Sequence, residues 1–331
     1  MKITFVNRKP RAYGNFSIES YFSILSKYLK EKAEISHWVA PFHSTGFLNR
    51  LLSVIALGKI NRSDIYHVTG DTNFLVLGLS KGKTVLTFHD IGFLSETKGI
   101  KKWILKKFWV ELPMKRADAV TTVSVATKND ILRFFPKWRK KIHVIPTVID
   151  PRFTRSDKAF NAVCPTILLI GSAPNKNLKR VLKATKGLNV QLSLVAELDA
   201  EEKALLAGQS YEVESSISFE SLLEKYRSAD IVMLCSTLEG FGMPIIEAQA
   251  TGRVVLTSNC SSMPDVAGNG ALLVDPISIK SMREGLEKLI SDASLREKLI
   301  QAGFENVKRF LPETISEMYY EVYSSLVKRR K

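Results

Sequence analysis

Cysteine is scarce in this sequence, and long apolar runs are missing from it. The three cysteines, Cys164, Cys235 and Cys260, are far apart and odd in number, which argues against a disulfide framework or metal cluster and indicates reduced core residues. No run approaches the roughly 18 apolar residues of a membrane-spanning helix. The apolar part of the N-terminus, residues 3–6, is too short for a signal peptide. We therefore expect a cytoplasmic protein that does not span a membrane.

Two signatures of nucleotide and nucleic-acid binding are also missing. A dehydrogenase built from Rossmann-like halves needs Gly-x-Gly-x-x-Gly after its first strand, and Gly14 stands alone there. The chain has no recognisable RNA- or DNA-binding module, and its aromatic residues are not spaced as stacking platforms for bases. The first absence argues against an oxidoreductase, whereas a basic nucleic-acid-binding protein stays open as an alternative because of the charge.

Acidic residues are few in the first half of the chain. Residues 1–150 carry 25 Lys and Arg against 11 Asp and Glu, an excess of 14, whereas residues 151–331 carry 23 against 22. Such a field attracts an anionic partner, which can be nucleic acid, a membrane surface or an acidic substrate. Lysines are interleaved with Trp and Phe in residues 98–110. This segment predicts either a helix that lies on anionic lipid or a peripheral helix with solvated lysines.

Short β-type runs alternate with helical patterns along the whole chain, which is typical of βαβ units and parallel sheets. The length of 331 residues suffices for two domains. We expect strands at residues 3–6, 35–39, 65–68, 84–88, 119–123 and 142–145, and then at 166–170, 190–195, 211–213, 231–234, 254–257 and 271–274. The sequence thus predicts an α/β fold with two open, mostly parallel sheets flanked by helices.

The most informative stretch is residues 239–248, Glu-Gly-Phe-Gly-Met-Pro-Ile-Ile-Glu-Ala. It follows an apolar run at 231–234 that predicts a buried strand, and it opens an apolar helix. Two glycines at such a turn let the backbone approach a ligand, and the amides of a helix's first turn can bind an anion. Glu239 lies in the loop and Glu247 lies inside the helix. The alternative is a capped helix with chance glycines.

Three further places carry candidate chemistry. His89 and Asp90 end the fourth strand, which is a better position for function than that of the other four histidines, which we interpret as structural. Lys176 lies in the loop after the strand at 166–170. Ser262 and Asp265 satisfy the pattern of a capping box at a later helix start.

The stretch 239–248 closely resembles the Glu-x7-Glu signature of retaining glycosyltransferases of family 4, also called glycosyl transferases group 1. Residues 118–124, 144–151, 171–177 and 258–266 resemble further segments of that family, although Asn175 stands where arginine is common. The resemblance implies the GT-B fold, with two facing Rossmann-like domains. It implies an acceptor domain at 1–151, a nucleotide-sugar domain at 163–310 and a C-terminal helix, 311–331, that packs back on the first domain.

The same resemblance implies roles for individual residues. Glu239 would hold a hydroxyl of the sugar, Glu247 would bind the ribose, and His89 would lie near the transferred sugar. Lys176 and the helix-start amides would stabilise the leaving diphosphate, so that no metal or other cofactor is required and no Asp-x-Asp motif is expected. The predicted catalytic residues are His89, Glu239 and Lys176, and the predicted donor-binding residues are Gly14, Ser172, Lys176, Ile217, Glu239, Gly240, Phe241, Gly242, Met243 and Glu247.

We therefore expect a retaining, metal-independent hexosyltransferase that uses a UDP- or GDP-sugar. Its acceptor would be a glycan or lipid-linked sugar, in polysaccharide, lipopolysaccharide or glycolipid synthesis, and no nucleic-acid partner is expected. The basic first domain leaves open a peripheral position on the anionic inner face of the cytoplasmic membrane. An inactive sugar-nucleotide binding protein of the same fold stays as a further alternative.

Overall fold

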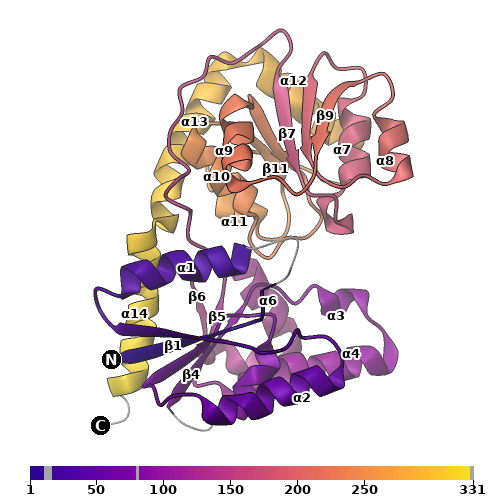
Figure 1. Cartoon of the computed structure of the whole chain (residues 1–331). Coiled ribbons are helices and arrows are strands. Elements are labelled where there is room, and N and C mark those ends of the chain that lie inside the picture. Colours follow the sequence, from indigo (N-terminus) through magenta and orange to yellow (C-terminus); the bar gives the residue numbers. More distant parts are fainter. Residues whose placement is uncertain (11–16, 80–81, 329–331) are drawn as a thin grey trace. The chain divides into compact units, whose positions relative to one another are not determined.

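A computed structural model describes residues 1–10, 17–79 and 82–328 of the chain (Figure 1). The chain forms two compact units, one made of residues 1–148 and 312–331 and the other of residues 149–311. We call them unit 1 and unit 2. Each unit contains a six-stranded sheet in which every neighbouring pair of strands runs parallel.

The strands lie where the apolar runs predicted them. Those of unit 1 are β1 (Lys2–Asn7), β2 (Glu34–Val39), β3 (Ile65–Val68), β4 (Lys83–Phe88), β5 (Ala119–Thr122) and β6 (Ile142–Val144). Those of unit 2 are β7 (Thr166–Ile170), β8 (Gln191–Val195), β9 (Ser210–Glu214), β10 (Ile231–Leu234), β11 (Val254–Ser258) and β12 (Leu272–Val274). The predicted fold class is confirmed.

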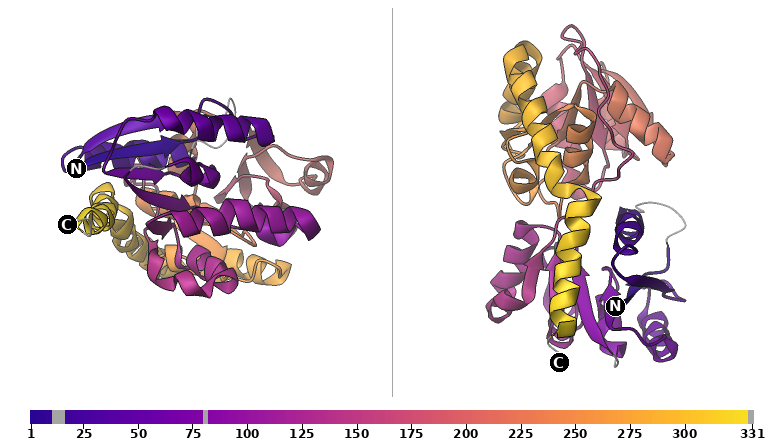
Figure 2. Two further views of the ribbon diagram at one scale, coloured as in Figure 1. Left: turned by 90° about the horizontal axis from the view of Figure 1, so that it is seen from below. Right: turned by 90° about the vertical axis from the view of Figure 1, so that its left-hand side faces the viewer.

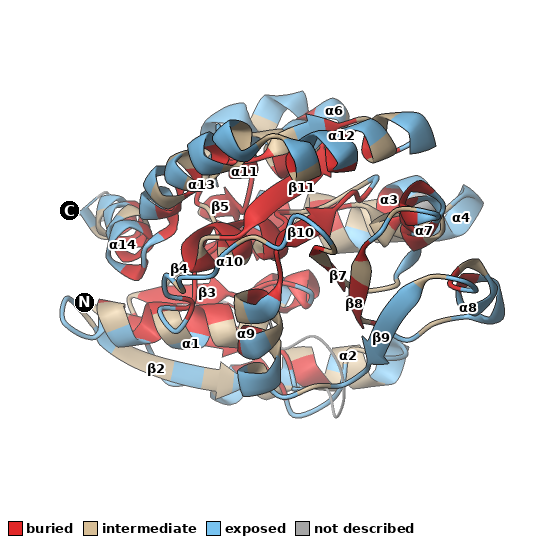
Figure 3. Cartoon of the chain, turned by 90° about the horizontal axis from the view of Figure 1, so that it is seen from above, coloured by how far each residue is buried: buried red, intermediate tan, exposed pale blue. Residues whose placement is uncertain are grey.

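Helices cover the sheets, and Figure 3 shows buried inner strands such as β10 and β11, more exposed edge strands β2 and β9, and helices whose outer faces are exposed. Unit 1 has α1 (Ser17–Leu29), α2 (Phe47–Ala56), α3 (Phe93–Glu96), α4 (Gly99–Leu105), α5 (Leu112–Arg116), α6 (Val125–Phe134) and α14 (Pro312–Lys328), with short turns η1 (Leu57–Lys59), η2 (Asn73–Gly78), η3 (Lys106–Glu111) and η4 (Pro136–Lys141). Unit 2 has α7 (Leu178–Thr185), α8 (Ala200–Leu205), α9 (Phe219–Ser228), α10 (Met243–Thr251), α11 (Met263–Ala267), α12 (Ile279–Ser291) and α13 (Ala293–Val307), with η5 (Pro174–Lys176) and η6 (Lys308–Phe310).

The C-terminal helix α14 completes the core of unit 1. In Figures 1 and 2 it runs beside the strands of that unit. Tyr319 and Tyr323 are fully buried in a cluster with apolar residues of α1, β1, β3 and β4. Tyr323 and Thr87 hydrogen-bond the two ring nitrogens of His67, and burial lowers the pKa of His67 to about 3. His67 is thus a neutral core residue, as predicted, and the expected return of the last helix to the first half of the chain is confirmed.

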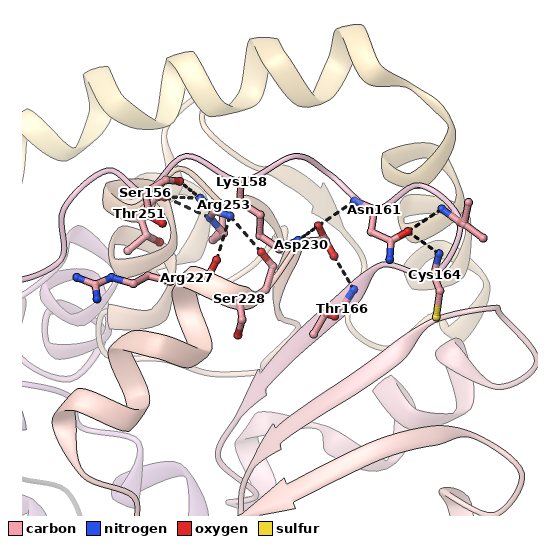
Figure 4. Close-up of polar contacts among 12 residues, drawn as sticks. Ser156, Lys158, Asn161, Cys164, Thr166, Arg227, Ser228, Asp230, Thr251 and Arg253 are labelled. Carbon is pink, nitrogen blue, oxygen red and sulfur yellow. Dashed lines mark hydrogen bonds and ion pairs between the residues drawn. The ribbon is translucent and has the colours of Figure 1, made fainter.

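The segment 152–162, which lies between the two expected domains 1–151 and 163–310, is held to unit 2 by buried polar groups (Figure 4). Arg253 is 5% exposed and donates to the carbonyl oxygens of Ser156 in the segment and of Thr251 at the end of α10. Asp230 accepts from the ammonium group of Lys158 and from the amide of Thr166 at the start of β7 (2.8 Å). The segment therefore belongs structurally to unit 2.

Each sheet has one point where the chain reverses its direction of strand addition. In unit 1 the strand order is β2-β1-β3-β4-β5-β6, so the reversal lies between β1 and β3. In unit 2 the order is β12-β11-β10-β7-β8-β9, so it lies between β7 and β10. Ligands of open α/β sheets bind beyond the carboxyl ends of the strands at such a point. The loops after these four strands are therefore the candidate ligand-binding loops.

Candidate active site

Two loops meet at the reversal point of unit 2. Lys176 comes from the loop after β7, and Glu239 comes from the loop after β10. The ammonium nitrogen Nζ of Lys176 lies 2.7 Å from Oε1 of Glu239. Their side chains are 20% and 13% exposed, so the pair is shielded from bulk water but still reachable by a ligand. The structure thus brings two of the predicted catalytic residues into direct contact, a pairing that the sequence did not predict.

Three serines hold Glu239 in place. Ser236 donates a hydrogen bond to Oε1 of Glu239 (2.6 Å). Ser261 accepts from the amide of Glu239 (3.1 Å) and donates to its carbonyl oxygen (2.8 Å). Ser262 donates to the same carbonyl oxygen (3.0 Å) and makes no cap bond at α11, so the capping box predicted for Ser262 and Asp265 is wrong. The Ser262 hydroxyl turns to the Glu239 loop because that loop's carbonyl groups need donors.

The loop after β7 is braced against the loop after β10. The side-chain amide of Asn175 donates to the carbonyl oxygen of Leu238 (2.8 Å), and the backbone carbonyl of Asn175 accepts from the amide of Thr237 (2.8 Å). Gly171 has φ +86°, and a Cβ there would lie 3.2 Å from Cε of Lys176. Asn175, at a position where the family commonly has arginine, therefore ties the two loops together beside Lys176.

Helix α10 begins at this site. Its N-cap residue, Gly242, has φ +105°, and a side chain there would be strained. Pro244 follows in the first turn, a position that suits proline because it needs no amide hydrogen. The ring of Phe241 is buried and packs edge-on against Phe310. This turn carries the backbone amides predicted to bind the diphosphate, those of Gly240, Phe241 and Gly242, and it leads into Met243, a further predicted donor-binding residue.

Glu247 lies further along α10, about one turn after Met243. It is partly buried and accepts a hydrogen bond from the phenol group of Tyr226 in α9. Burial raises the pKa of Glu247 to about 7, although the Tyr226 hydroxyl and the charge of Lys176 both lower it. Tyr226 is fully buried, and Phe153 packs edge-on against its ring. The sequence analysis missed Tyr226, because its link to Glu247 joins two different helices.

The remaining predicted donor contacts lie in different segments. Ser172 is half-buried in the loop after β7, between Gly171 and Lys176. Ile217 is half-buried in the loop between β9 and α9, immediately before the N-cap residue Ser218. Gly14 lies outside the described residues. All these assignments stay predictions.

In unit 1, His89 lies at the carboxyl end of β4, as predicted. Its Nε2 donates to the carbonyl oxygen of Thr69 (2.8 Å), which leaves Nδ1 of the neutral ring as an acceptor. Burial lowers the pKa of His89, and the nearby carboxylates of Asp71 and Asp90 only partly offset this. A neutral imidazole is therefore the form near pH 7. Gly70 leaves room for it, since a Cβ there would lie 2.4 Å from the ring.

A cavity of about 110 Å³ lies beside His89. It is lined by Asp71, Asn73, Phe88, His89, Asp90, Phe93 and Trp109. Arg8, at the end of β1, forms an ion pair with Asp71 and a two-pronged pair with Glu19 of α1 (2.7 and 3.0 Å). Residues 69–73 were not predicted from the sequence. Their signal was the dipeptide Gly70-Asp71, which follows closely after the buried strand at 65–68.

In residues 1–10, 17–79 and 82–328, no group of His, Cys, Asp or Glu is arranged to hold a metal ion. Over the same ranges, no helix has both the length and the apolar character needed to cross a bilayer.

The family of the chain follows from two sequence models. Residues 153–306 match the model for "Glycosyl transferases group 1", and residues 28–153 match the model for "Glycosyltransferase Family 4". The chain belongs to the family 4 glycosyltransferases. The Lys176–Glu239 pair lies within the first matched region.

Curated relatives of this glycosyltransferase include two mannosyltransferases. It is 27% identical over 231 residues to the MMP alpha-(1->4)-mannosyltransferase of Mycolicibacterium hassiacum, a match that covers 65% of the chain and 56% of that protein. It is 25% identical over 261 residues to the O-antigen chain mannosyltransferase RfbU of Salmonella typhimurium, which covers 74% of the chain and 72% of RfbU. The chain thus spans little more than half the length of the first relative.

Solved structures confirm the GT-B fold of the glycosyltransferase. Sucrose-phosphate synthase from Thermosynechococcus elongatus superposes with a TM-score of 0.80 at 17% identity, over 99% of both chains. Anabaena HepE in complex with UDP and glucose superposes with a TM-score of 0.78 at 16% identity, over 98% of this chain and 100% of that one. At these identities the likeness concerns the fold alone.

Proposed function

We propose that this glycosyltransferase moves a sugar from a nucleoside diphosphate sugar to an acceptor hydroxyl, with retention of the anomeric configuration and without a metal ion. The observation that carries the proposal is the shielded Lys176–Glu239 pair, beside the start of α10, at the reversal point of unit 2. A cation and helix-start amides stabilise the charge that develops on a leaving diphosphate.

In this proposal the two glutamates hold hydroxyl groups of the donor. The Glu239 carboxylate has acceptor capacity beyond its bonds to Lys176 and Ser236, and it accepts from a hydroxyl of the sugar. Glu247 accepts a hydrogen bond from a hydroxyl group of the ribose. It does so through Oε1, because Tyr226 donates to Oε2, or through Oε2 after the ribose hydroxyl has replaced that of Tyr226. Ser172 and Ile217 are the candidate contacts with the phosphates and the base, together with Gly14.

The transfer itself needs no separate protein base. The bond from the anomeric carbon to the phosphate oxygen breaks, and the acceptor oxygen bonds to that carbon from the same face. The acceptor proton moves to a phosphate oxygen of the leaving diphosphate, which balances the charge. His89, neutral and with Nδ1 as an acceptor, is the candidate contact with the transferred sugar in unit 1.

We propose a UDP- or GDP-sugar as the donor, and the relatives named above support a nucleotide-sugar donor and a role in surface glycan synthesis. The HepE complex contains UDP and glucose, RfbU builds O-antigen chains, and both curated relatives above are mannosyltransferases. We propose a glycan or lipid-linked sugar as the acceptor, in polysaccharide, lipopolysaccharide or glycolipid synthesis.

A thermal-shift screen tests the donor site. We expect one of UDP, GDP, ADP or CMP, or a sugar conjugate of one, to raise Tm, and the shift to persist with chelator. Glu247→Ala should abolish it, whereas Glu284→Ala, an exposed glutamate of α12, should not. NMR of the product should then show the anomeric configuration of the donor. Stabilisation by an oligonucleotide and by no sugar nucleotide would instead contradict the proposal.

We also propose that unit 1 rests on an anionic membrane surface. In helix α4 and the π-helical turn η3, Val110 is buried in the core, and Leu105 and Trp109 pack against it partly buried, as in a peripheral helix. Other apolar side chains of the same segment stay exposed, among them Ile100 (79%) and Trp103 (61%). Lysines 101, 102, 106 and 107 lie between them. Apolar side chains with interleaved lysines suit the headgroup region of an anionic bilayer.

Helix α2 extends this apolar surface. Its exposed side chains include Phe47 (79%), Leu48 (65%) and Ile55 (61%), and Arg50 of the same helix stacks over the ring of Trp109. Cosedimentation with phosphatidylcholine vesicles, with and without phosphatidylglycerol, tests the surface. We expect binding only to the anionic vesicles, and we expect the double change Phe47→Ser and Trp103→Ser to remove most of it. Equal sedimentation with both vesicle types would contradict an anionic-lipid partner.

A further inference from the structure

Tyr226 contacts Glu247 from a neighbouring helix. Its hydroxyl group, on α9, donates a hydrogen bond to Oε2 of Glu247, on α10. Tyr226 is fully buried, and within residues 1–10, 17–79 and 82–328 this is the one hydrogen bond that its hydroxyl makes. A buried hydroxyl that loses its partner is costly, because the group has already been removed from water. A ligand that displaced the phenol from Glu247 would therefore bind weakly.

Aromatic packing fixes the ring of Tyr226. Phe153, in the segment before β7, packs edge-on against it, with the ring centroids 5.2 Å apart. Phe153 packs in the same way against Phe219, the first residue of α9 (5.4 Å). Phe153 is 5% exposed and Tyr226 is 0% exposed. Both ends of α9 are thus held by one aromatic ring, and the hydroxyl of Tyr226 has one well-defined position at Glu247.

Glu247 has a second oxygen that the protein does not use. Within the described ranges, Oε1 of Glu247 accepts no hydrogen bond, whereas Oε2 accepts that of Tyr226. Two side-chain atoms there are both buried and without a partner, Oδ1 of Asn73 and Oγ1 of Thr84, and Oε1 is not among them. A ligand can therefore reach Oε1 while Tyr226 stays in place.

We propose that Tyr226, held by Phe153, is a positioning residue of the donor site. Its phenol group keeps its bond to Oε2 of Glu247 while the nucleotide is bound, and it thereby turns Oε1 toward a hydroxyl group of the ribose. The proposal rests on the proposed function, in which Glu247 binds the ribose. It goes further because it names the residue that orients the carboxylate and the oxygen that the ribose uses.

The same hydrogen bond affects the charge of Glu247. The groups that act on this carboxyl are Tyr226 of α9, Lys176 of η5 and Asp150 in the segment after β6. Burial raises the pKa of Glu247 to about 7, and Asp150 raises it as well. The Tyr226 hydroxyl and Lys176 both lower it. Since a protonated carboxyl gives up part of its acceptor capacity, Tyr226 both orients Glu247 and favours the form that accepts from hydroxyls.

Calorimetric titration with UDP or GDP, whichever the thermal-shift screen selects, tests the proposal in Tyr226→Phe. The variant keeps the ring beside Phe153 and loses the hydroxyl. One lost hydrogen bond to a carboxylate should raise the pKa of Glu247 by about one, which cuts its ionised fraction at pH 7 from about one half to about one tenth. We expect the Kd to rise about fivefold at pH 7 and less than about twofold at pH 9.

The Kd of each variant is divided by that of the unmodified chain at the same pH, which removes the titration of the nucleotide itself. Tyr66→Phe is the matched control, because Tyr66 is also fully buried and donates to the carbonyl oxygen of Asn61 (2.8 Å), but in unit 1. It should lose stability and keep a Kd ratio near one at both pH values. The Tm without ligand shows that each variant is folded.

Phe153→Leu is a second, independent variant. It keeps the Tyr226 hydroxyl and removes the ring that holds it, so we expect a smaller rise in Kd at pH 7 than in Tyr226→Phe, and again little change at pH 9. Combined with Tyr226→Phe, it should add little to the effect at pH 7, because both changes act through the same hydrogen bond.

Each outcome decides a separate point. A Kd ratio near one at both pH values in Tyr226→Phe overturns the positioning role and leaves the proposed function standing. A ratio raised equally at pH 7 and pH 9 assigns Tyr226 to the packing of α9 alone, and tighter binding by the variant means that the phenol obstructs the ribose; both overturn the proposal. If the unmodified chain binds no nucleotide, the proposed function fails, and the positioning role fails with it.

Discussion

The two reversal points of this glycosyltransferase are built in the same way and differ in the number of acids that bind the cation. In each unit a cation that follows the first strand contacts an acid that follows the strand on the other side of the reversal. The pair is Arg8–Asp71 in unit 1 and Lys176–Glu239 in unit 2. In unit 1 a second acid, Glu19 of α1, shares the cation. Among the described residues, these ion pairs therefore join one cation to two acids in unit 1 and one cation to one acid in unit 2.

Under the proposed function, this difference gives the two units different ligand chemistries. Unit 2 adds the start of α10 to its ion pair, which suits a diphosphate, because helix-start amides attract anions. Unit 1 adds carboxylate and amide oxygens to its ion pairs, which suits hydroxyl groups. The following experiments test the comparison, from the largest expected effect to the smallest.

Lys176→Met should have the largest effect. If Lys176 binds the leaving diphosphate as proposed, the variant lacks the cation that stabilises it, and we expect the rate of sugar transfer to fall by about 10²–10³. Initial rates with the donor found in the thermal-shift screen measure this. Lys183→Met, on the exposed side of α7, is the control and should keep full activity. A loss below about threefold in Lys176→Met would show that the pair does not serve the diphosphate.

Arg8→Met should destabilise unit 1. The guanidinium group is 8% exposed and binds two carboxylates, so its removal takes a cation away from both Asp71 and Glu19. We expect a loss of about 2 kcal/mol, less than for a fully buried pair because Asp71 is partly exposed. Urea unfolding gives the free energy. Lys179 also contacts two acids, Asp199 and Glu201, but on the surface. Lys179→Met should therefore leave stability unchanged, and a similar loss in both variants would refute the special role of Arg8.

Glu247 should make stability depend on pH. Burial raises the pKa of Glu247 to about 7, above the ordinary value of about 4.3, so the folded state binds the proton more tightly. Folding stability therefore falls as pH rises through this window. Glu247→Gln stays neutral, and its stability relative to the unmodified chain should grow by an amount on the order of 2–3 kcal/mol between about pH 4.5 and pH 7.

Urea unfolding across this pH range measures the effect, with Glu284→Gln as the control that should track the unmodified chain. A constant difference between Glu247→Gln and the unmodified chain would show that Glu247 is ionised throughout. The unmodified chain should also bind its nucleotide more tightly as pH rises, because the ionised carboxylate is the better acceptor for ribose hydroxyls.

Asn175→Ala should have the smallest effect. It removes the hydrogen bond that ties the two loops of unit 2, which is worth about 1 kcal/mol. We expect a slight loss of stability and a several-fold weaker nucleotide affinity, because Lys176 is held less firmly. Asn189→Ala removes a similar bond, to the Val163 carbonyl oxygen, far from the site, and should leave nucleotide affinity unchanged. Equal affinities in both variants would mean that the brace is irrelevant to binding.

The sequence was sufficient for the strands, because each is an apolar run between polar segments. It also predicted Glu239, Lys176 and His89 as candidates, since loops after parallel strands meet at one sheet edge. The sequence did not predict which residues contact these side chains. Arg8 and Asp71 are 63 positions apart, and Tyr226 reaches Glu247 from another helix. Ser262 fitted a local capping pattern but bonds to a distant loop, since long-range carbonyl groups compete for the same hydroxyl.

The position of α14 has a consequence for biosynthesis. Chains emerge from the ribosome from the N-terminus, and domains often fold as they appear. The core of unit 1 includes Tyr319 and Tyr323, which are translated after all of unit 2. Until then, apolar residues such as Phe5 and Phe22 lack the helix that covers them. The first unit to begin synthesis is therefore the last to be completed, and a nascent chain released before Pro312 would carry an exposed sheet face that chaperones bind.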